Sequence, residues 1–535
     1  MGGGLIQLVA YGIEDIYLTK EPQITYFKIV YRRHTNFSTE QIPVYFVQDA
    51  DFGQRVSCTV SPEGDLVNGV ALVIKIPKVN PLSNLNETSL TVDSSGTELF
   101  KYNRFAWVRR IGYAMIKYVE VEINGRVIDR HYGEWLHIWN ELVGPRDRGH
   151  DKNIGDIPEL YDYTESKEEY TLMVPLQFWF CRSPGLALPL VALQYSTVKI
   201  NIEFNVANKC YSVLPTHYIE CNNDLTNFKK YEYIEQTIDG VKRAGLFVHY
   251  DIINKRLYYL KLTKNKLIGI EYDGDKSLLT QSDIDTIFNS DTALKYQIVG
   301  SESQFIATPN IGVLSKSNYI PPLDYLSIVN SYLLVDYVFL DEEERIKISQ
   351  SKHDYLIEQL YFTPSTKIEG TNRKVKISVN QPCKLGAWIV QLDNIDSIND
   401  SFNYTDSYKR KKKVSDLGYI TFNDYIGKSL IEEETLLLNG KERISMRPSE
   451  YFTNCQPHQH FEYEPSVGTN IYSFGLFPSS LQPSGACNMG QIDSVEVKMK
   501  FSSAINVINT GKFRAYCLVE NVVRISNGLM GLLFT

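Results

Sequence analysis

Alternation of apolar and polar residues restricts the fold of this 535-residue chain more than any other feature. Apolar side chains occupy every second position in runs such as Val70–Ile76 and Val119–Ile123. A period of two places one face of a strand on a core and the other face towards solvent. Asn-Gly pairs at 124–125 and 439–440 predict tight hairpin turns, because both central positions of a type I′ turn need a positive φ. The sequence therefore predicts antiparallel sheets.

The chain also repeats one of its own patterns. The alternating run Val198–Phe204 recurs as Val495–Phe501, and a Pro/Gly-containing turn precedes each copy, at 182–185 and 482–485. At the same offset, Phe180 matches Phe477 and Ser183 matches Ser480. Two copies of one β-fold, with many short strands and long connections, favour sandwiches with jelly-roll wiring. The predicted fold class is all-β, with two consecutive antiparallel jelly-roll sandwiches and few short helices.

These patterns divide the chain into an N-terminal arm at 1–25, a first jelly roll at 26–215 and a second at 216–535. Residues of about 236–321 are extra in the second copy, so they predict a surface insertion with strands of its own. The strongest helix prediction covers Gly133–Val143. Its apolar residues follow helical spacing; they are Trp135, Ile138, Trp139 and Leu142. Gly144-Pro145 ends the predicted helix.

Composition disfavours several classes of protein. The formal net charge of −8 disfavours direct binding of nucleic acid, which needs a basic surface. Eight scattered cysteines without a C-x-x-C pair suit a reducing compartment rather than a disulfide scaffold. The first residues lack a basic n-region, and no run of 18 apolar residues occurs, so we expect neither a secretory signal nor a membrane-spanning helix.

Three motifs suggest ligand chemistry, and each is incomplete. Gly427-Lys428-Ser429 ends like a phosphate-binding loop, but Phe422 stands where the first glycine of that loop is needed. His131, Glu134 and His137 do not have the spacing of the H-E-x-x-H zinc motif, so local hydrogen bonding is the simpler role. His458 and His460 would share one face of a strand, but no third metal ligand is near in sequence.

The charged runs and glycosylation sequons have plain explanations too. The basic run Lys409–Lys413 suits a solvated loop tip better than a nuclear address or a phosphate-binding patch. Asp341–Glu344 is one charged run, and sequence alone does not show two carboxylates facing across a cleft. Four N-glycosylation sequons begin at Asn36, Asn86, Asn399 and Asn403. They matter only if the chain encounters a glycosylation machinery. We therefore predict no catalytic, cofactor-binding or metal-binding residues and no cofactor.

Longer blocks of the sequence resemble a known family. The chain resembles the major capsid proteins of nucleocytoplasmic large DNA viruses in these blocks: Gly2–Gly12, Asp15–Thr19, Pro22–Lys28, Tyr31–Phe37, Ile128–Leu136, Pro175–Tyr195, Asp336–Asp341 through Tyr355–Gln359, and Gln482–Met489. The blocks cover nearly the whole chain, with 236–321 covered least. Ordered matches of this length are far more specific than a short motif.

The resemblance implies a double jelly roll whose homotrimer is a pseudo-hexagonal capsomer tiling an icosahedral shell. It implies a non-enzymatic subunit in the virion, assembled in the host cytoplasm. The expected partners are further copies of the chain, minor capsid proteins and the inner viral membrane, the last through the N-terminal arm. We expect this arm on the inner side of the shell and the 236–321 insertion on its exterior.

Three alternatives remain open at the level of sequence. Within the same class, the chain could be a minor capsid paralogue or a transient assembly scaffold that is absent from the mature particle. Outside it, a jelly-roll carbohydrate-binding or glycoside-active protein would need a sugar-sized cleft with convergent carboxylates and aromatic rings. Abundance in purified particles distinguishes a shell subunit from an enzyme.

Overall fold

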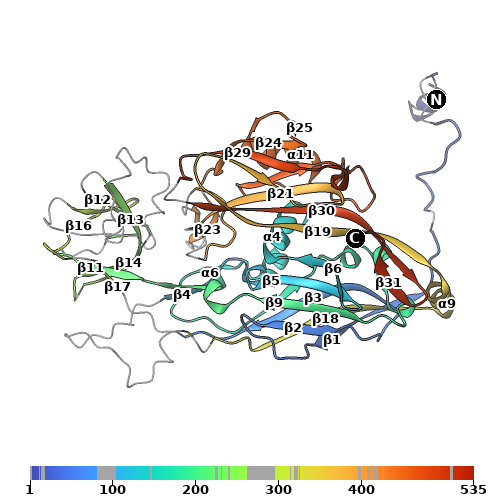
Figure 1. Ribbon diagram of the computed structural model, residues 1–535, viewed down its shortest axis with the longest axis horizontal. Helices are drawn as coiled ribbons and strands as arrows, with labels where there is room; N and C mark the ends of the chain where they lie inside the picture. Colours follow the sequence, from blue (N-terminus) through green and yellow to red (C-terminus); the bar gives the residue numbers. More distant parts are fainter. Residues whose placement is uncertain are drawn as a thin grey trace.

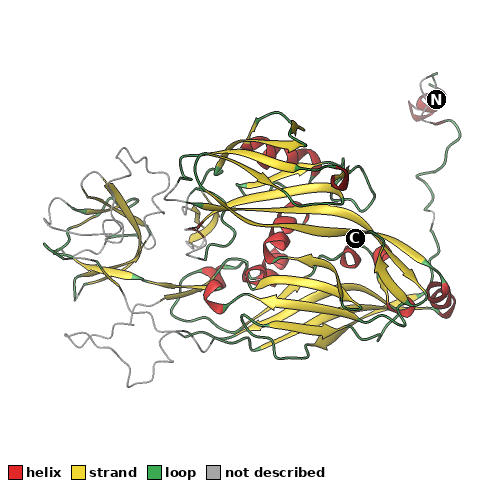
Figure 2. Cartoon of the chain, in the orientation of Figure 1, coloured by secondary structure: helices red, strands yellow, loops and turns green. Residues whose placement is uncertain are grey.

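The structure is a computed structural model of the full chain (Figure 1). It describes all residues except 1–2, 11, 14–18, 30, 81–103, 145–147, 223–226, 230–231, 239–240, 253, 262–295, 314, 318–322, 324–325, 394, 396–398, 407–409, 415–419, 426, 507–509 and 535. Within the described part, strands dominate and helices are short (Figure 2).

Two β-sandwiches form the body of the molecule. In the first, a sheet in the order β1-β18-β3-β7 packs on a sheet in the order β2-β9-β5-β6. The strands are β1 (Phe37–Tyr45), β2 (Arg55–Thr59), β3 (Leu66–Ile76), β5 (Ile116–Ile123), β6 (Arg126–His131), β7 (Tyr170–Pro175), β9 (Val198–Phe204) and β18 (Asn330–Leu340).

The second sandwich repeats this arrangement with the sheets β19-β30-β21-β27 and β20-β29-β24-β25. Its strands are β19 (His353–Ile368), β20 (Asn372–Lys376), β21 (Pro382–Leu392), β24 (Ile431–Leu438), β25 (Lys441–Glu442), β27 (Thr469–Ser473), β29 (Val495–Phe501) and β30 (Gly511–Ser526). The two repeated runs of the sequence, β9 and β29, take the same place in their sheets. The predicted duplication of an antiparallel jelly roll is confirmed.

Local predictions hold at the turns. Asn124 and Gly125 have φ values of 53° and 80° and connect β5 to β6. Asn439 and Gly440, with φ values of 49° and 74°, connect β24 to β25. Side chains that alternate along each strand fill the space between the sheets, as Leu72, Ile74 and Ile76 of β3 do in the first core.

The predicted domain boundary at residue 216 needs correction. Strand β18 pairs with β1 and β3, so residues 330–340 complete the first sandwich and do not begin the second. We therefore propose that the first jelly roll comprises about 37–214 and 326–340, and the second about 353–532. The boundary was misplaced because the last strand of the first copy lies beyond the insertion, where only long-range pairing identifies it.

The insertion accordingly interrupts the first copy, not the second, and begins before residue 236. It forms a separate antiparallel sheet with its own core. Its strands are β11 (His217–Glu220), β12 (Tyr233–Ile238), β13 (Val241–Asp251), β14 (Arg256–Lys261), β15 (Ile298–Gly300), β16 (Ile306–Ala307) and β17 (Lys316–Ser317). The predicted hairpin of β13 and β14 is present. The body reaches this sheet through β10 (Tyr211–Leu214), which pairs with β4 (Arg104–Trp107).

The N-terminal arm reaches beyond its predicted end at residue 25, since the first strand starts at Phe37. It contains the short helix α1 (Gly3–Val9), and its described side chains from Leu5 onward are exposed. Arm and insertion lie at opposite ends of the long axis (Figure 1). None of the described helices has the length and apolar character needed to cross a membrane.

Candidate functional site: the junction between the sandwiches

Helix α4 (Gly133–Val143) lies between the two sandwiches (Figure 1). It matches the predicted helix, and its apolar stripe is buried against the sheet of the second sandwich that contains β21 and β30. The residues of this contact are Trp135, Ile138, Trp139 and Leu142 of α4 with Leu360, Leu385, Ala387, Ile389, Tyr404, Ile471, Tyr516 and Leu518. A helix from a connection of the first sandwich therefore provides part of the core of the junction.

A close backbone approach fixes the start of α4. A Cβ atom at Gly133 would lie 2.1 Å from the carbonyl oxygen of Tyr113 and 2.4 Å from that of Ile116. Such distances are far shorter than any real contact, so only glycine lets the helix begin against this backbone. At its end, Gly144 adopts extended backbone and the chain leaves the helix.

Glu134 connects α4 to the second sandwich. Its carboxylate accepts two hydrogen bonds of 2.6 Å from the Nε and Nη2 atoms of Arg514 on β30. It also accepts hydrogen bonds from the hydroxyl groups of Tyr516, at 2.5 Å, and Tyr404, at 3.2 Å. A bidentate, charge-assisted pair of this kind defines both distance and orientation. Burial alone would lower the pKa of Arg514, but the charge of Glu134 and its hydrogen bonds raise that pKa above the ordinary value.

A second buried cluster surrounds the other end of the helix. Arg110 donates to Asp156 at 3.0 Å and to Glu141 at 2.9 Å. Glu141 also accepts hydrogen bonds from the backbone N–H of Ser466, at 2.9 Å, and from its hydroxyl group, at 2.5 Å. Because Ser466 belongs to the second sandwich and Arg110 to the first, Glu141 links the two.

The protonation states in this cluster follow from its burial. Burial lowers the pKa of the His137 imidazole to about 3, and the neighbouring charge of Arg110 acts in the same direction. For Glu141, burial would raise the pKa, but the positive charge of the cluster and the hydrogen bonds from Ser466 lower it. At neutral pH, His137 is therefore neutral and Glu141 ionised.

A third contact joins the sandwiches directly. Glu358 of β19 pairs with Arg182 of α7 (Trp179–Arg182) and with Lys384 of β21. The guanidinium of Arg182 also lies 4.4 Å from the centre of the Trp139 ring. Two ion pairs, the hydrogen bonds from Ser466 to Glu141 and one apolar face thus hold the two sandwiches together as a single unit, a geometry suited to a rigid building block.

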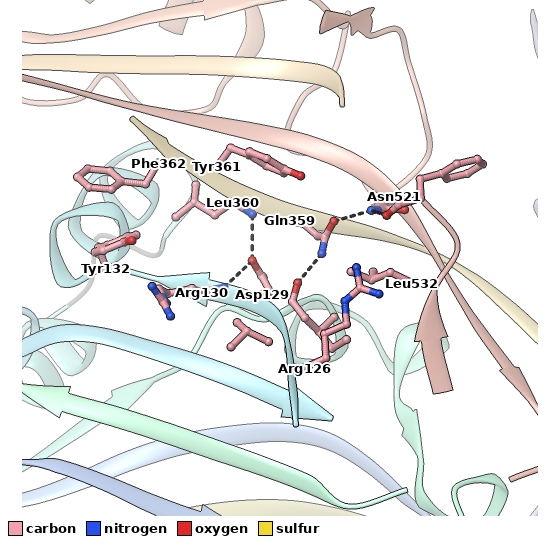
Figure 3. Close-up of a pocket in the computed structure, with 13 residues that line it drawn as sticks. Arg126, Asp129, Arg130, Tyr132, Gln359, Leu360, Tyr361, Phe362, Asn521 and Leu532 are labelled. Atoms are coloured by element: carbon pink, nitrogen blue, oxygen red, sulfur yellow. Dashed lines mark hydrogen bonds between the residues drawn. The ribbon is translucent and has the colours of Figure 1, made fainter. Parts of the chain in front are cut away.

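A cavity of about 330 Å³ opens beside this junction, between β6 of the first sandwich and β19 and β30 of the second (Figure 3). Some of its polar groups are bonded to each other: Asp129 accepts from the backbone N–H of Leu360 at 3.0 Å, and Asn521 donates to Gln359 at 2.8 Å. The lining residues are Arg126, Val127, Ile128, Asp129, Arg130, Tyr132, Gln359, Leu360, Tyr361, Phe362, Asn521, Leu532 and Phe534. A single carboxylate lines this cavity, whereas glycoside hydrolysis uses a facing pair.

The histidines considered as metal ligands have other contacts. His131 stacks on Phe178 with ring centres 4.8 Å apart, and its Nε2 atom lies 2.9 Å from an Asp129 oxygen. Glu134 faces Arg514, and His137 packs on Phe402 at 4.3 Å. Residues His131, Glu134 and His137 therefore do not converge. Among the described residues, no group of three His, Cys, Asp or Glu side chains could hold a metal ion.

His458 and His460 lie on the short helix α11 (Gln456–His460), not on a strand. The strand geometry that would place both rings on one face is therefore absent. The ring of His460 instead lies 3.0 Å from the carbonyl oxygen of Leu476.

The remaining motifs are structural where the structure describes them. A Cβ atom at Gly427 would lie 2.2 Å from the hydroxyl of Thr405, so this glycine permits close packing. Asp341 caps helix α9 (Glu342–Gln350) by accepting from the N–H of Glu344. Asn403 is fully buried, and the Asn399 side chain donates to the carbonyl of Tyr211 at 2.7 Å, so neither sequon is open. The side chains of Phe422 and of the basic run 409–413 are not described, and Asn86 lies outside the described residues; Asn36 is exposed.

Sequence patterns do not single out the ionic contacts of the junction. Glu134 and Glu141 are seven positions apart on one helix and therefore share a face beside the apolar stripe. Two carboxylates in that position are a signal for buried partners. Their partners Arg514 and Ser466 are more than 300 positions away, and no local pattern identifies them.

Comparison with known proteins agrees with this architecture. Residues 25–250 match the family model described as "Major capsid protein N-terminus", and residues 344–531 match "Large eukaryotic DNA virus major capsid protein". The chain is 41% identical to "Probable capsid protein 4" of Acanthamoeba polyphaga mimivirus, over all of this chain and 99% of that protein. It is 31% identical to the "Major capsid protein" of Phaeocystis pouchetii virus, over the full length of both.

Solved structures share the fold at low sequence identity. The "Faustovirus major capsid protein" aligns with a TM-score of 0.62 and 13% identity, over 96% of this chain and 94% of that one. A chain of the "PBCV-1 virus capsid, quasi-atomic model" aligns with a TM-score of 0.59 and 21% identity, over 96% of this chain and all of that one.

Fold and relatives together define the class: a double jelly-roll capsid subunit. The chain belongs to the family of major capsid proteins of large eukaryotic DNA viruses. It is a structural component of the virion's capsid shell, assembles with its own copies into the capsid lattice, and is not an enzyme.

Proposed function

We propose that three copies of this chain form a pseudo-hexagonal capsomer and that such capsomers tile the flat faces of an icosahedral shell. The observation that carries this proposal is the identical strand order of the two sandwiches. A ring of three chains then presents six similar walls, because each chain contributes two. The junction around α4 supports the proposal, since a tile must keep its two halves in a fixed orientation.

The orientation of the tile follows from the two ends of the molecule. The insertion occupies one end of the long axis and the arm the other (Figure 1). The insertion has its own core and needs no cover from a neighbour. The arm exposes the apolar side chains of Leu5, Ile6, Leu8 and Val9, and these require a covering surface from a neighbour. The insertion therefore faces the exterior, and the arm faces the inner side.

The partners of the inner side follow from the same exposure. Burial of apolar arm residues against another surface is favourable, and it lowers the free energy by roughly 25 cal/mol for each Å² removed from water. Neighbouring subunits, minor capsid proteins and the inner membrane are the partners that a shell offers there. Among these, a neighbouring copy is the partner present in every capsomer.

The mass and outline of the particle in solution test the trimer. We expect light scattering on the purified chain, whose mass is 61.3 kDa, to give three times that mass at micromolar concentration. Electron microscopy should show a six-cornered outline. An obligate assembly of this kind buries more than ~2,000 Å² at each interface, so it should persist on dilution. A monomer at micromolar concentration contradicts the proposal.

A role as minor paralogue or transient scaffold would share the fold and the trimer. The protein composition of purified virions separates these roles. An abundant band near 61.3 kDa supports the bulk shell subunit. A trimer that is formed in infected cells but is absent or scarce in virions supports the alternative.

A further inference from the structure

The cavity beside the junction has a partly apolar lining, and helix α1 exposes apolar side chains. We propose that the cavity of one subunit receives the α1 helix of a second copy. This inference rests on the proposed function only for the presence of neighbouring copies, and it names the place where the arm binds.

The cavity has the size and lining of a receptor for aliphatic side chains. Its volume of about 330 Å³ is about twice the ~150 Å³ of an engineered protein cavity that holds benzene. Six of its 13 lining residues are apolar; they are Val127, Ile128, Leu360, Phe362, Leu532 and Phe534. Val127 and Phe534 are 37% and 54% exposed at the rim, so the apolar lining continues to the surface.

The helix offers a matching face. Leu5, Leu8 and Val9 fall three and four positions apart, and residues at that spacing lie on one side of a helix. Leu8 and Val9 are 79% and 77% exposed, which is unusual for residues of this type in a regular element. The helix lies away from both sandwiches (Figure 1), so its own body does not cover it.

Charge supports the same pairing. Arg130 at the cavity is paired with Glu120, and Asp129 is bonded to the backbone of β19. Arg126 has no carboxylate partner among the described residues and is exposed at the mouth. Glu14 and Asp15 follow the apolar helix in the sequence and supply the opposite charge. An exposed pair of this kind adds little affinity but favours one direction of the bound segment.

The arm is long enough to reach a neighbour. The chain between Val9 and Phe37, where β1 begins, spans up to about 90 Å when extended at roughly 3.3 Å per residue. An exchange of arms between copies requires a tether of this kind. It would connect neighbouring subunits without altering the sandwiches.

Site-directed cross-linking between two full-length variants tests the proposal. A Leu8→Cys chain is mixed with a Val127→Cys chain and treated with a short bismaleimide. A link between positions 8 and 127 can then form only between two copies. The matched control replaces Val127→Cys by Ile346→Cys, because Ile346 on α9 is 46% exposed but does not line the cavity. Each cysteine variant is also mixed with the unmodified chain. This reaction measures the cross-links that native thiols such as Cys455, which is exposed, form by themselves.

We expect a band at twice the mass of the chain, at least fivefold stronger for the 8–127 pair than for the control. Excess peptide of residues 2–20 should suppress it. Equal yields for both pairs, or no link in samples that contain trimers, overturn this inference and leave the trimer intact. Loss of the trimer itself would instead contradict the proposed function. A peptide that floats with anionic phospholipid vesicles and does not suppress the link also overturns it, in favour of a membrane partner.

Discussion

Glu434 is a carboxyl group inside the core of the second sandwich. It is fully buried, and its Oε2 atom accepts a hydrogen bond of 2.7 Å from the indole N–H of Trp388. Its Oε1 atom has no hydrogen-bond partner among the described residues. Burial raises the pKa of Glu434 from 4.5 to about 8, although the bond from Trp388 opposes this. The residue is therefore neutral near pH 7 and holds its place as a carboxylic acid.

This raised pKa predicts that stability falls as pH rises from about 4.5 to about 8. Because the pKa is higher in the folded chain, the contribution of Glu434 is complete below pH 4.5 and is lost as pH rises through about 8. The limiting slope is about 1.4 kcal/mol per pH unit. The Glu434→Gln variant keeps an acceptor for Trp388 and should lose this dependence. Urea unfolding from pH 5 to pH 9 measures it; Glu442→Gln, at an exposed position, is the control. Equal slopes in Glu434→Gln and the unmodified chain would contradict the assignment.

The junction cluster has the opposite dependence. Burial lowers the pKa of His137 from 6.5 to about 3, so protonation of this ring favours the unfolded state as pH falls below 6.5. The pKa of Glu141 is lowered from 4.5 to about 2, so its contribution is present above pH 4.5 and is lost below it. Both effects weaken the junction in acid.

Protonation of His137 lowers the free energy of unfolding between pH 7 and pH 4, while protonation of Glu434 acts in the opposite direction over part of this range. We therefore expect the free energy of unfolding at pH 4, relative to that at pH 7, to be higher in the His137→Gln variant than in the unmodified chain. Thermal unfolding followed by calorimetry measures both. His458→Gln, which alters an exposed histidine on α11, should keep the slope of the unmodified chain. A His137→Gln chain that is as acid-sensitive as the unmodified one would show that other groups dominate.

Among the elements, α4 links the two sandwiches through its buried aromatic side chains. Trp139 is 4% exposed, packs against Trp135 at 5.6 Å between ring centres, and lies beneath Arg182. Truncation of a buried aromatic side chain typically costs 3–5 kcal/mol, so Trp139→Ala should lower the free energy of unfolding by about that amount. Chemical unfolding measures the loss, with Ile346→Ala on the exposed face of α9 as the control. A loss below about 1 kcal/mol would mean that α4 does not hold the junction.

The elements also show what sequence can predict. The bounds of α4 are predictable because its helical spacing is regular and Gly144-Pro145 ends it. The hairpins at 124–125 and 439–440 are predictable because two positive φ angles in sequence favour Asn-Gly. Strand β18 also has clearly alternating buried side chains, but this pattern would fit either sandwich. Its pairing with β1, nearly 300 positions earlier, decides to which sandwich it belongs. The partners of Glu134 are hidden for the same reason.

For the whole molecule, the insertion is a separate unit with its own sheet and core. Its core residues, such as Ile219, Phe247 and Ile298, pack on one another, and its strands pair only within its own sheet. Replacement of residues 217–317 by a short Gly/Ser linker should therefore leave the trimer and the unfolding of both sandwiches nearly unchanged. Light scattering and circular dichroism measure these properties. Aggregation or loss of the trimer would show that the insertion supports the body.

The position of the insertion in the particle has its own test. If it faces the exterior, limited proteolysis of intact virions should cut within 217–317 first and spare the arm. Mass spectrometry of the released peptides identifies the sites. Early release of residues 1–36, with the insertion protected, would reverse the proposed orientation. Disrupted particles, in which both ends are open to protease, serve as the control.

The register of β11 and β17 has a practical consequence. His217 is opposite Ser317 in an antiparallel pair, so the chain enters and leaves the insertion at neighbouring points. Opposite residues in such a pair have Cα atoms about 5 Å apart. Any folded module with similarly close termini meets the geometric requirement for exchange at this point. A foreign antigen or enzyme grafted there would be displayed once per subunit, in a regular array across the particle.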